Sequence, residues 1–185
     1  MRVRRVVPGV NLQSTDFELF DLAPQFAQDR AAIDARWKDL QREAHPDKFA
    51  AQGASAQRLA MQWSVRINEA YQRLKNPLQR AAYLCELHGA SVNAESNTAM
   101  PAAFLMQQMA WRESLEDIQA LTAAPDKAKA LEALLEEVHA LQAQVLAQAA
   151  SLIDEAQDFQ SAVGQVRSLM FIDKFAQEVQ QHLDR

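Results

Sequence analysis

Apolar residues recur at intervals of three and four along most of the chain, and this spacing predicts amphipathic helices. Ile33, Trp37 and Leu40 fall on one face of a helix expected over about 29–44. This helix is expected to stop before Pro46, because the residue before a proline is pushed out of helical geometry. Further helices are expected over about 16–22, 54–74, 77–87, 101–121, 127–152 and 159–183.

The composition agrees with a helical protein. Glycine is rare at 4 residues in 185 and proline at 6, whereas alanine, leucine, glutamine and glutamate, which favour helices, are abundant. Runs of β-branched residues are nearly absent. The apolar share of 49% indicates a folded chain rather than a disordered one. We therefore predict an all-α protein of one ordinary domain or two small ones.

The segment 89–99 interrupts the helical pattern, since its residues are small or polar and show no periodicity. Charge also differs on either side of it. Residues 1–90 carry 13 lysines and arginines against 10 acidic residues, a net charge of +3, whereas residues 91–185 carry 6 against 14, a net charge of −8. We therefore predict two units that meet different partners. The expected organisation is an extension over 1–13, an amino-terminal unit over 14–89, a linker over 90–99 and a three-helix unit over 100–185.

Several classes of site are not expected. Cys85 is the single cysteine, which excludes an internal disulfide, and its apolar neighbours predict a buried structural thiol. His88, His139 and His182 show no metal-ligand spacing, and no glycine-rich phosphate loop is present, so we expect no metal and no cofactor. A charge of +3 is too small to indicate nucleic-acid binding, and no stretch approaches the roughly 20 apolar residues of a membrane span. The apolar part of residues 1–10 is too short for a signal peptide, so the cytoplasm is the expected compartment.

The tripeptide His45-Pro46-Asp47 fills the loop between the first two long helices. Pro46 fixes the backbone, so the loop is expected to present His45 and Asp47 rigidly. The carboxylate of Asp47 can make a charge-assisted contact with an arginine on a partner. We therefore interpret this loop as a candidate protein-binding site.

The helix before the loop is basic. Lys38 and Arg42 lie four residues apart and share a face, whereas Arg36 lies off to one side. Lys38 and Arg42 can steer the unit onto an acidic surface of a partner. Taken singly, such cationic positions are more often a solvated helix face.

Two other interpretations of the loop are open. His-Pro-Asp can be an ordinary turn in which Asp47 caps the next helix. His45 can also act as a general base beside Asp47, but no motif places a nucleophile or a second carboxylate next to the pair. We therefore expect a protein without enzymatic activity of its own.

Around this loop, the stretch 15–87 resembles a J-domain, the module that stimulates ATP hydrolysis by DnaK-class chaperones. The resemblance depends on the loop tripeptide, on Ile67-Asn68-Glu69-Ala70-Tyr71, and on Asn76-Pro77 with Arg80-Ala81. It implies that the amino-terminal unit over 14–89 is a J-domain. The chaperone-binding residues that it implies are Lys38, Arg42, His45, Pro46, Asp47 and Lys48.

The helix expected over 101–121 carries two apolar sets. One set forms a stripe that can fill the bundle core: Phe104, Trp111, Leu115 and Ile118. The other set, continued by two carboxylates, lies on a different side: Leu105, Met106, Met109, Glu113 and Asp117. An apolar patch rimmed by carboxylates is typical of a protein-binding surface. The alternative is that the second set packs under a neighbouring helix or the first unit.

Both halves resemble the HscB-type co-chaperones of iron–sulfur cluster assembly. The resemblance lies in AFLMQQMAWRESLEDI at 103–118, in VRSLMFIDKF at 166–175, and in the HPDKF and YLCELHG segments, and it extends over nearly all the chain from Asp16. It implies an L-shaped molecule in which a J-domain precedes a three-helix bundle. It also implies that this protein delivers the scaffold IscU to the DnaK-like chaperone HscA and stimulates ATP hydrolysis by HscA.

The same resemblance implies a scaffold-binding set of Leu105, Met106, Met109, Glu113, Asp117 and Phe171. Ala110 stands where the family can have an acidic residue, so binding is expected to depend more on apolar area. The chain lacks the amino-terminal cysteine cluster of some relatives, which indicates the bacterial form. The alternatives are a J-domain co-chaperone for other clients, which usually has a glycine- and phenylalanine-rich or cysteine-rich region, and a structural helical adaptor.

Overall fold

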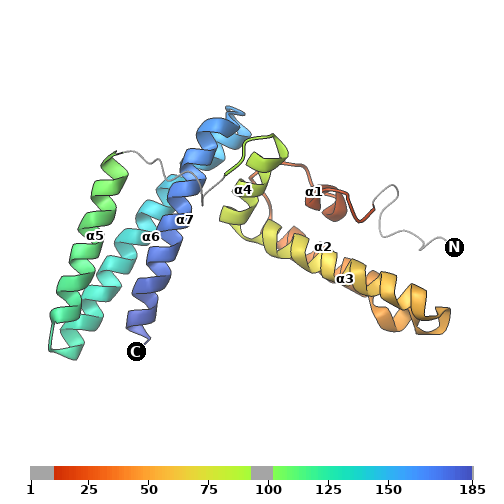
Figure 1. Cartoon of the computed structure of the whole chain (residues 1–185), viewed down its shortest axis with the longest axis horizontal. Helices are drawn as coiled ribbons and strands as arrows, with labels where there is room; N and C mark the ends of the chain where they lie inside the picture. Colours follow the sequence, from red (N-terminus) through yellow and green to blue (C-terminus); the bar gives the residue numbers. More distant parts are fainter. Residues whose placement is uncertain (1–10, 93–101, 185) are drawn as a thin grey trace. The chain divides into compact units, whose positions relative to one another are not determined.

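The computed structural model describes residues 11–92 and 102–184, and all regular structure in these ranges is helical (Figure 1). The elements are α1 (Asp16–Phe20), α2 (Arg30–Ala44), the 3-10 helix η1 (Pro46–Gln52), α3 (Ala54–Lys75), α4 (Pro77–Leu87), α5 (Ala102–Ala120), α6 (Ala124–Asp154) and α7 (Phe159–Leu183). The all-α prediction is therefore confirmed.

Local sequence explains where the helices begin and end. The Thr15 hydroxyl accepts the N–H of Glu18, and the Glu18 carboxylate accepts the N–H of Thr15 at 2.7 Å, which together cap α1. This helix stops two residues earlier than predicted, because Asp21 adopts a left-handed conformation with φ of 55°. In contrast, α6 begins at Ala124, three residues earlier than predicted, since Pro125 suits the first turn of a helix.

The chain divides into two compact units, Met1–Leu84 and Cys85–Arg185. The division falls inside α4, whereas the sequence pattern predicted a boundary after residue 89. Ala90 and Val92, which belong to the predicted linker, are buried, and Arg167 Nε donates to the Val92 carbonyl at 2.6 Å. Residues 93–99 of the predicted linker lie outside the described residues.

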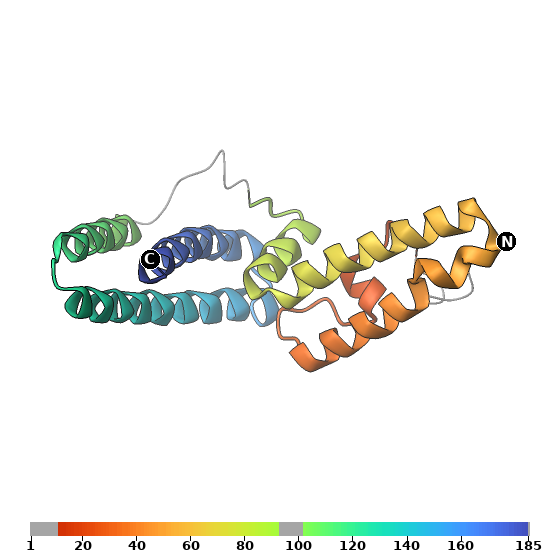
Figure 2. The same ribbon diagram turned by 90° about the horizontal axis from the view of Figure 1, so that it is seen from below.

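In the first unit, α2 and α3 lie side by side and antiparallel, joined by η1 (Figure 2). Their apolar stripes meet because residues three and four apart share a helix face. The fully buried side chains of this interface are Ile33, Leu40, Ile67 and Leu74. Trp37, which was predicted on the buried stripe of α2, is only half-buried.

A buried carboxylate ties α1 to α3. Asp16 has no exposed surface, and its oxygens lie 2.6 Å from Arg66 Nη2 and 2.9 Å from Arg73 Nη1. The N–H of Asp16 donates to the hydroxyl of Tyr83 on α4 at 3.0 Å. A buried charge is tolerated only when it is paired, so this carboxylate fixes where α1 docks.

In the second unit, α5, α6 and α7 form a three-helix bundle, as predicted (Figure 1). α7 contributes nine buried residues, but α5 contributes only Trp111 and Leu115. Trp111 stacks on Phe175 of α7, with 5.4 Å between ring centroids, and its indole N–H donates to Glu137 of α6 at 2.8 Å. A single aromatic residue thus anchors α5 to both of its neighbours.

Cys85 is fully buried, and burial raises the pKa of its thiol to about 11. The thiol is therefore protonated near neutral pH, and the prediction of a buried structural thiol is confirmed. Within the described residues, no group of three or more histidine, cysteine or acidic side chains is arranged to hold a metal ion. None of the described helices is both long and apolar enough to cross a membrane.

Candidate functional site

The connection between α2 and α3 is a hydrogen-bonded 3-10 helix rather than an open loop. Pro46 is its first residue, and the N–H of Lys48 donates to the carbonyl of His45 at 3.0 Å. The His45 ring adds a contact, since its Nδ1 accepts the N–H of Asp47 at 3.3 Å. These bonds and the proline ring hold residues 45–48 in one backbone conformation.

This backbone displays the Asp47 carboxylate. The side chain of Asp47 is 90% exposed and that of His45 is 56% exposed, with 3.6 Å between His45 Nδ1 and Asp47 Oδ2. The N-caps of η1 and α3 are His45 and Gly53, so Asp47 does not cap the helix that follows. The interpretation of Asp47 as a helix cap is therefore wrong, and its carboxylate faces solvent.

The basic residues of α2 are also accessible. Lys38 and Lys48 are exposed. Arg42 Nη2 lies 3.3 Å from Asp39 Oδ1, and these two side chains are 71% and 52% exposed. A surface pair of this kind contributes little free energy, so Arg42 can exchange Asp39 for a partner's carboxylate. Arg36, which lies off the basic face, is half-buried.

A row of side-chain hydrogen bonds that the sequence analysis missed links α2 to α3. Gln41 Nε2 and Trp37 Nε1 both donate to Asn68 Oδ1, at 2.7 and 3.0 Å. Ser64 Oγ donates to Gln41 Oε1 at 3.0 Å, and Trp37 stacks on Tyr71 with 4.6 Å between ring centroids. The polar residues at spacings of three and four on both helices were the available signal. Because the row ends one turn before the loop, it stiffens the base from which the loop projects.

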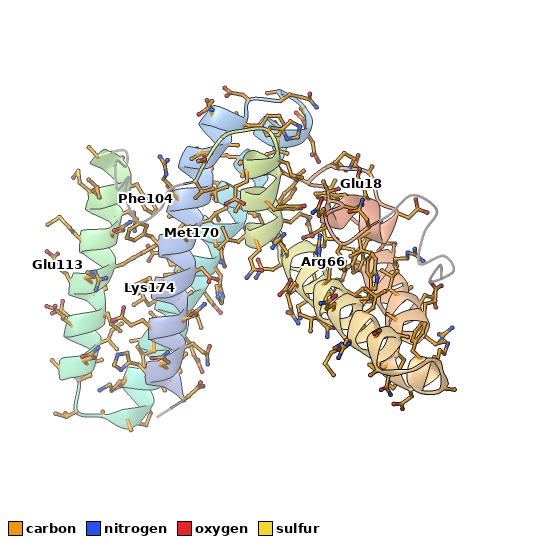
Figure 3. All side chains as sticks on the ribbon, turned by 45° about the vertical axis from the view of Figure 1, so that its right-hand side comes forward. Glu18, Arg66, Phe104, Glu113, Met170 and Lys174 are labelled. Atoms are coloured by element: carbon orange, nitrogen blue, oxygen red, sulfur yellow. The ribbon has the colours of Figure 1, made fainter. Side chains whose placement is uncertain are left out.

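The predicted scaffold-binding residues lie mostly on the outer side of α5. The exposed fractions are 46% for Leu105, 71% for Met106, 63% for Met109 and 40% for Phe171. Glu113 and Asp117 are exposed as well, and Figure 3 shows Glu113 on the side of α5 that faces away from α7. The alternative in which a neighbouring helix covers the second apolar set is wrong. We call these six residues the α5 face.

Phe171 comes from α7 and approaches α5 from the side. It lines a small hollow together with Gln108 and Arg112 of α5, and Arg112 Nη1 lies 4.0 Å from Glu178 of α7. Leu105 is one turn before Gln108, so it occupies the neighbouring position along the same edge of α5. The structure therefore places Phe171 beside the edge of α5 that carries Leu105, whereas Met106 lies farther round the helix.

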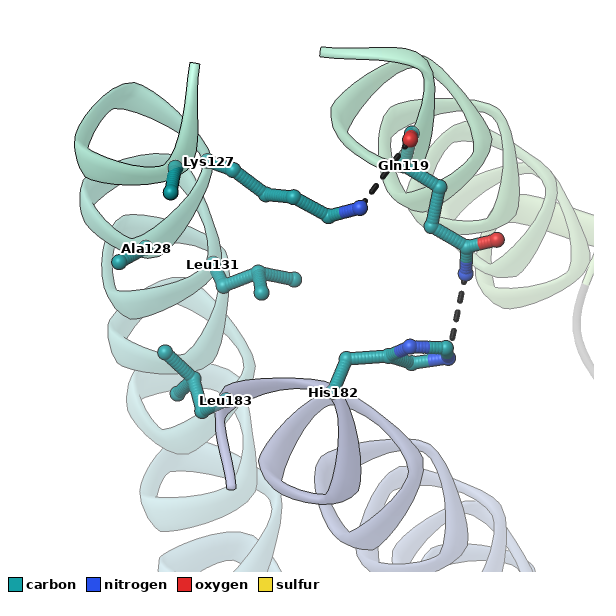
Figure 4. A pocket seen from close by; sticks show the side chains of 7 residues that line it. Gln119, Lys127, Ala128, Leu131, His182 and Leu183 are labelled. Atoms are coloured by element: carbon teal, nitrogen blue, oxygen red, sulfur yellow. Dashed lines mark hydrogen bonds between the residues drawn. The ribbon is translucent and has the colours of Figure 1, made fainter. Parts of the chain in front are cut away.

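A larger cavity of about 550 Å³ opens at the end of the bundle, where α5, α6 and α7 meet (Figure 4). Its polar groups are paired with each other: Lys127 Nζ donates to the carbonyl of Gln119 at 3.1 Å, and Gln119 Nε2 lies 3.1 Å from His182 Nε2. The remaining lining is aliphatic, and it contains none of the predicted binding residues. This cavity does not belong to either candidate surface.

Comparison with known proteins gives matches over most of the chain. Residues 100–180 match the sequence model of the HSCB C-terminal oligomerisation domain. A co-chaperone protein HscB homolog of Burkholderia multivorans is 48% identical over 176 residues, which cover 95% of this chain and 98% of the relative. The corresponding protein of Paraburkholderia xenovorans is 46% identical over 175 residues, with 95% and 97% covered.

Two solved structures have the same fold. The chaperone HscB from Vibrio cholerae matches with a TM-score of 0.79 and 36% identity, over 92% of this chain and 98% of that one. Human co-chaperone protein HscB matches with a TM-score of 0.84, over 94% and 84% of the two chains, but at 24% identity it shows the fold alone. The class that these proteins define is the all-helical co-chaperone. The chain belongs to the HscB family of co-chaperones.

Proposed function

We propose that this co-chaperone acts in iron–sulfur cluster assembly by carrying the scaffold protein IscU to the DnaK-like chaperone HscA. In this proposal the amino-terminal unit is a J-domain that docks on HscA and stimulates ATP hydrolysis, while the α5 face holds IscU. The observation that carries the proposal is that both predicted surfaces are exposed and have opposite chemistry, one charged and one apolar. Such a protein works in the cytoplasm and catalyses no reaction itself.

The His45–Lys48 loop supports the chaperone contact. An aspartate that is 90% exposed on a hydrogen-bonded backbone can meet an arginine of the partner without first losing conformational freedom. Lys38 and Arg42 add positive charge on the helix that leads into the loop. They favour a partner surface that is acidic, and their main effect is expected on the rate of association.

The α5 face supports the scaffold contact. Leu105, Met106 and Met109 expose apolar area that the bundle core does not use, and Phe171 extends it from α7. Methionine side chains adapt to the shape of a partner, which suits a surface that holds a folded client. The two carboxylates at 113 and 117 give the patch a negative rim that selects a partner with basic residues.

The two contacts together explain how a protein without a catalytic site can raise an ATPase rate. Holding IscU on the same chain raises the effective concentration of IscU beside HscA. If IscU and this protein both favour one state of HscA, each strengthens the effect of the other, which is a coupling free energy between sites. The loop thus triggers hydrolysis, and the α5 face supplies the client.

The test is the steady-state ATPase rate of HscA with IscU, measured with this protein, with its Asp47→Ala variant, or with a Met106→Ala/Phe171→Ala double variant. We expect strong stimulation by the unaltered protein and none by Asp47→Ala. The double variant should keep the stimulation seen without IscU and lose the additional IscU-dependent part. Absence of stimulation by the unaltered protein would refute the proposal. Stimulation that does not respond to IscU would instead indicate a co-chaperone for other clients.

A further inference from the structure

Exposed apolar side chains gather in two places in the part of the chain that the structure describes. Nine large ones are exposed there, and four of these belong to the α5 face. Three others lie together in the first unit: Leu12, Met61 and Val65 are 36%, 61% and 53% exposed. Clustered apolar exposure usually marks an interaction surface, and the proposed function gives this second cluster no role.

The second cluster lines a groove of about 520 Å³ along the outward face of α3, with Leu12 at its side. Met61 and Val65 are four residues apart and therefore adjacent on the helix surface. The complete lining consists of Leu12, Arg58, Met61, Gln62, Val65, Arg66 and Glu69. We call this the α3 groove. It combines an apolar floor with a charged rim, the usual anatomy of a small protein-binding site.

The wall of the groove is held in place by the buried ion pair of the first unit. Arg66, labelled in Figure 3, donates from Nη2 to the carbonyl of Ser14 at 2.8 Å and from Nε to that of Leu12 at 3.4 Å. The same guanidinium is fixed by Asp16, which lies 2.6 Å away and is fully buried. Leu12 is therefore positioned before any partner arrives, which lowers the entropy cost of binding.

The rim of the α3 groove can pair with an acidic side chain of a partner through Arg58. Arg66 is already paired with the buried Asp16, so the rim offers a partner one cation, Arg58, and one carboxylate, Glu69. Arg58 is engaged only by Ser55 Oγ at 3.3 Å among the contacts seen in the described residues. Lys38 and Arg42 on α2 have the same sign of charge. A partner with acidic side chains can therefore pair with the basic helix and with Arg58.

The position of the groove also indicates which partner fills it. α3 starts directly after η1, and about 17 Å of helix separates its first residue, Ala54, from Val65 at about 1.5 Å per residue. A standard interface covers about 800 Å² on each partner, so a protein that engages the loop can reach the α3 groove without a second binding event.

We propose that the α3 groove is a second contact for the DnaK-like chaperone, which fills it with an apolar segment flanked by an acidic side chain. This inference rests on the proposed function, because it assumes that the chaperone docks on the loop. The two contacts have different tasks. Asp47 anchors the chaperone and triggers hydrolysis, whereas the groove adds apolar area that raises the affinity further without changing the maximal rate.

The test is a titration of the HscA ATPase with the full chain, comparing the unaltered protein with a Met61→Gln/Val65→Gln variant. We expect the concentration for half-maximal stimulation to rise about tenfold while the maximal rate stays unchanged. Leu87→Gln is the matched control, since it makes the same kind of change at an apolar residue that is 40% exposed outside the groove. Arg58→Glu should raise the half-maximal concentration about threefold, and added salt should reduce this difference.

Each outcome separates this inference from the proposed function. If the unaltered protein stimulates HscA and the groove variant gives the same curve, the inference is refuted and the proposed function stands. If the unaltered protein does not stimulate HscA, both fail. A groove variant that loses affinity for IscU, or that changes its sedimentation coefficient at high concentration, would assign the groove to the scaffold or to a second copy and overturn the proposal. Suppose that removal of residues 1–10 raises the half-maximal concentration as much as the groove variant does, with no further effect of the groove variant in the shortened chain. That result would assign the groove to residues 1–10 and overturn the proposal.

Discussion

The loop at 45–48 and the α5 face present a partner with two different kinds of surface. The loop is small and charged, and the proline and local hydrogen bonds hold its backbone in place. The α5 face is broad and apolar, and it lies on a helix that contributes only two buried side chains to its bundle. The loop can recognise a partner by the position of one carboxylate, whereas the α5 face must rely on area.

This difference predicts how substitutions and salt weaken binding at each surface. A contact that depends on one charge-assisted hydrogen bond is disabled by a single substitution, because the partner's charge is left unpaired. A contact that depends on apolar area loses affinity in steps, and one or two central side chains account for most of the loss. Salt should weaken the first contact and leave the second nearly unchanged. These expectations can be tested one surface at a time.

The largest effect is expected at the loop. Asp47→Asn keeps the shape of the side chain and removes its charge, so we expect the affinity for HscA to fall about 30-fold or more. Binding of IscU should not change. Glu43→Gln, which makes the same chemical change at an exposed carboxylate of α2, is the control and should leave the affinity for HscA near the unaltered value. The measurement is calorimetric or kinetic titration with HscA; equal losses in both variants would mean that net charge, not the position of Asp47, is recognised.

The second-largest effect on binding is expected on the α5 face. Met106→Ala and Phe171→Ala should each weaken IscU binding about 5- to 30-fold, because each truncation removes a large exposed apolar side chain that the contact would bury. Stimulation of HscA in the absence of IscU should be unaffected. Leu121→Ala is a suitable control, since Leu121 is 43% exposed but lies outside the face. Isothermal titration with IscU measures the losses, and a similar loss in the control would contradict the assignment of the face.

A smaller effect separates the two surfaces by their chemistry. Raising the ionic strength from about 0.05 M to about 0.5 M should weaken HscA binding about fivefold and change IscU binding less than about twofold. The reason is that salt screens exposed charges and does not reduce apolar burial. The two dissociation constants are measured in parallel across the salt series. If both dissociation constants changed equally with salt concentration, the two contacts would depend on charge to the same extent.

The smallest effect is expected at Ala110, an exposed residue beside the apolar part of the α5 face. Ala110→Glu adds a carboxylate near Glu113 and Asp117, so IscU binding should tighten about two- to threefold. Ala110→Gln has nearly the same size without the charge and should have little effect. Competition binding with labelled IscU resolves a difference of this size. Weaker binding of the glutamate variant would mean that IscU presents no basic residue at this position.

The helices themselves were largely predictable from the sequence. Apolar residues at spacings of three and four predicted α2, α3 and the bundle helices, and the prolines at 46 and 77 marked where helices change. The ends were less predictable, because Asp21 ends α1 by adopting a left-handed conformation and Pro125 lies inside the first turn of α6. The charged loop could also be predicted, because its backbone is set by a proline and by neighbours in sequence.

The tertiary contacts that hold the candidate surfaces in place were not predictable from the sequence. No sequence pattern near Asp16 indicates that it is buried, but it is a fully buried partner of Arg66 and Arg73, which are distant along the chain. Asn68 lies in a recognisable segment, but its bonds to Trp37 and Gln41 depend on how α2 and α3 face each other. The α3 groove has no signal in the periodicity, since Leu12 joins Met61 and Val65 only after the chain folds.

The sequence by itself therefore determined the helices, the buried thiol and the chemistry of the loop, because each depends on residues within a turn or two of one another. Only the tertiary structure decided which apolar residues stay exposed. Leu105, Met106 and Met109 have no spacing that distinguishes a surface patch from a second buried stripe. They stay exposed because Trp111 and Leu115 are the only α5 side chains that are buried against the neighbouring helices, and Phe171 reaches only one edge of α5 from another helix. Exposure depends on what distant segments cover, and helical periodicity contains no information about that.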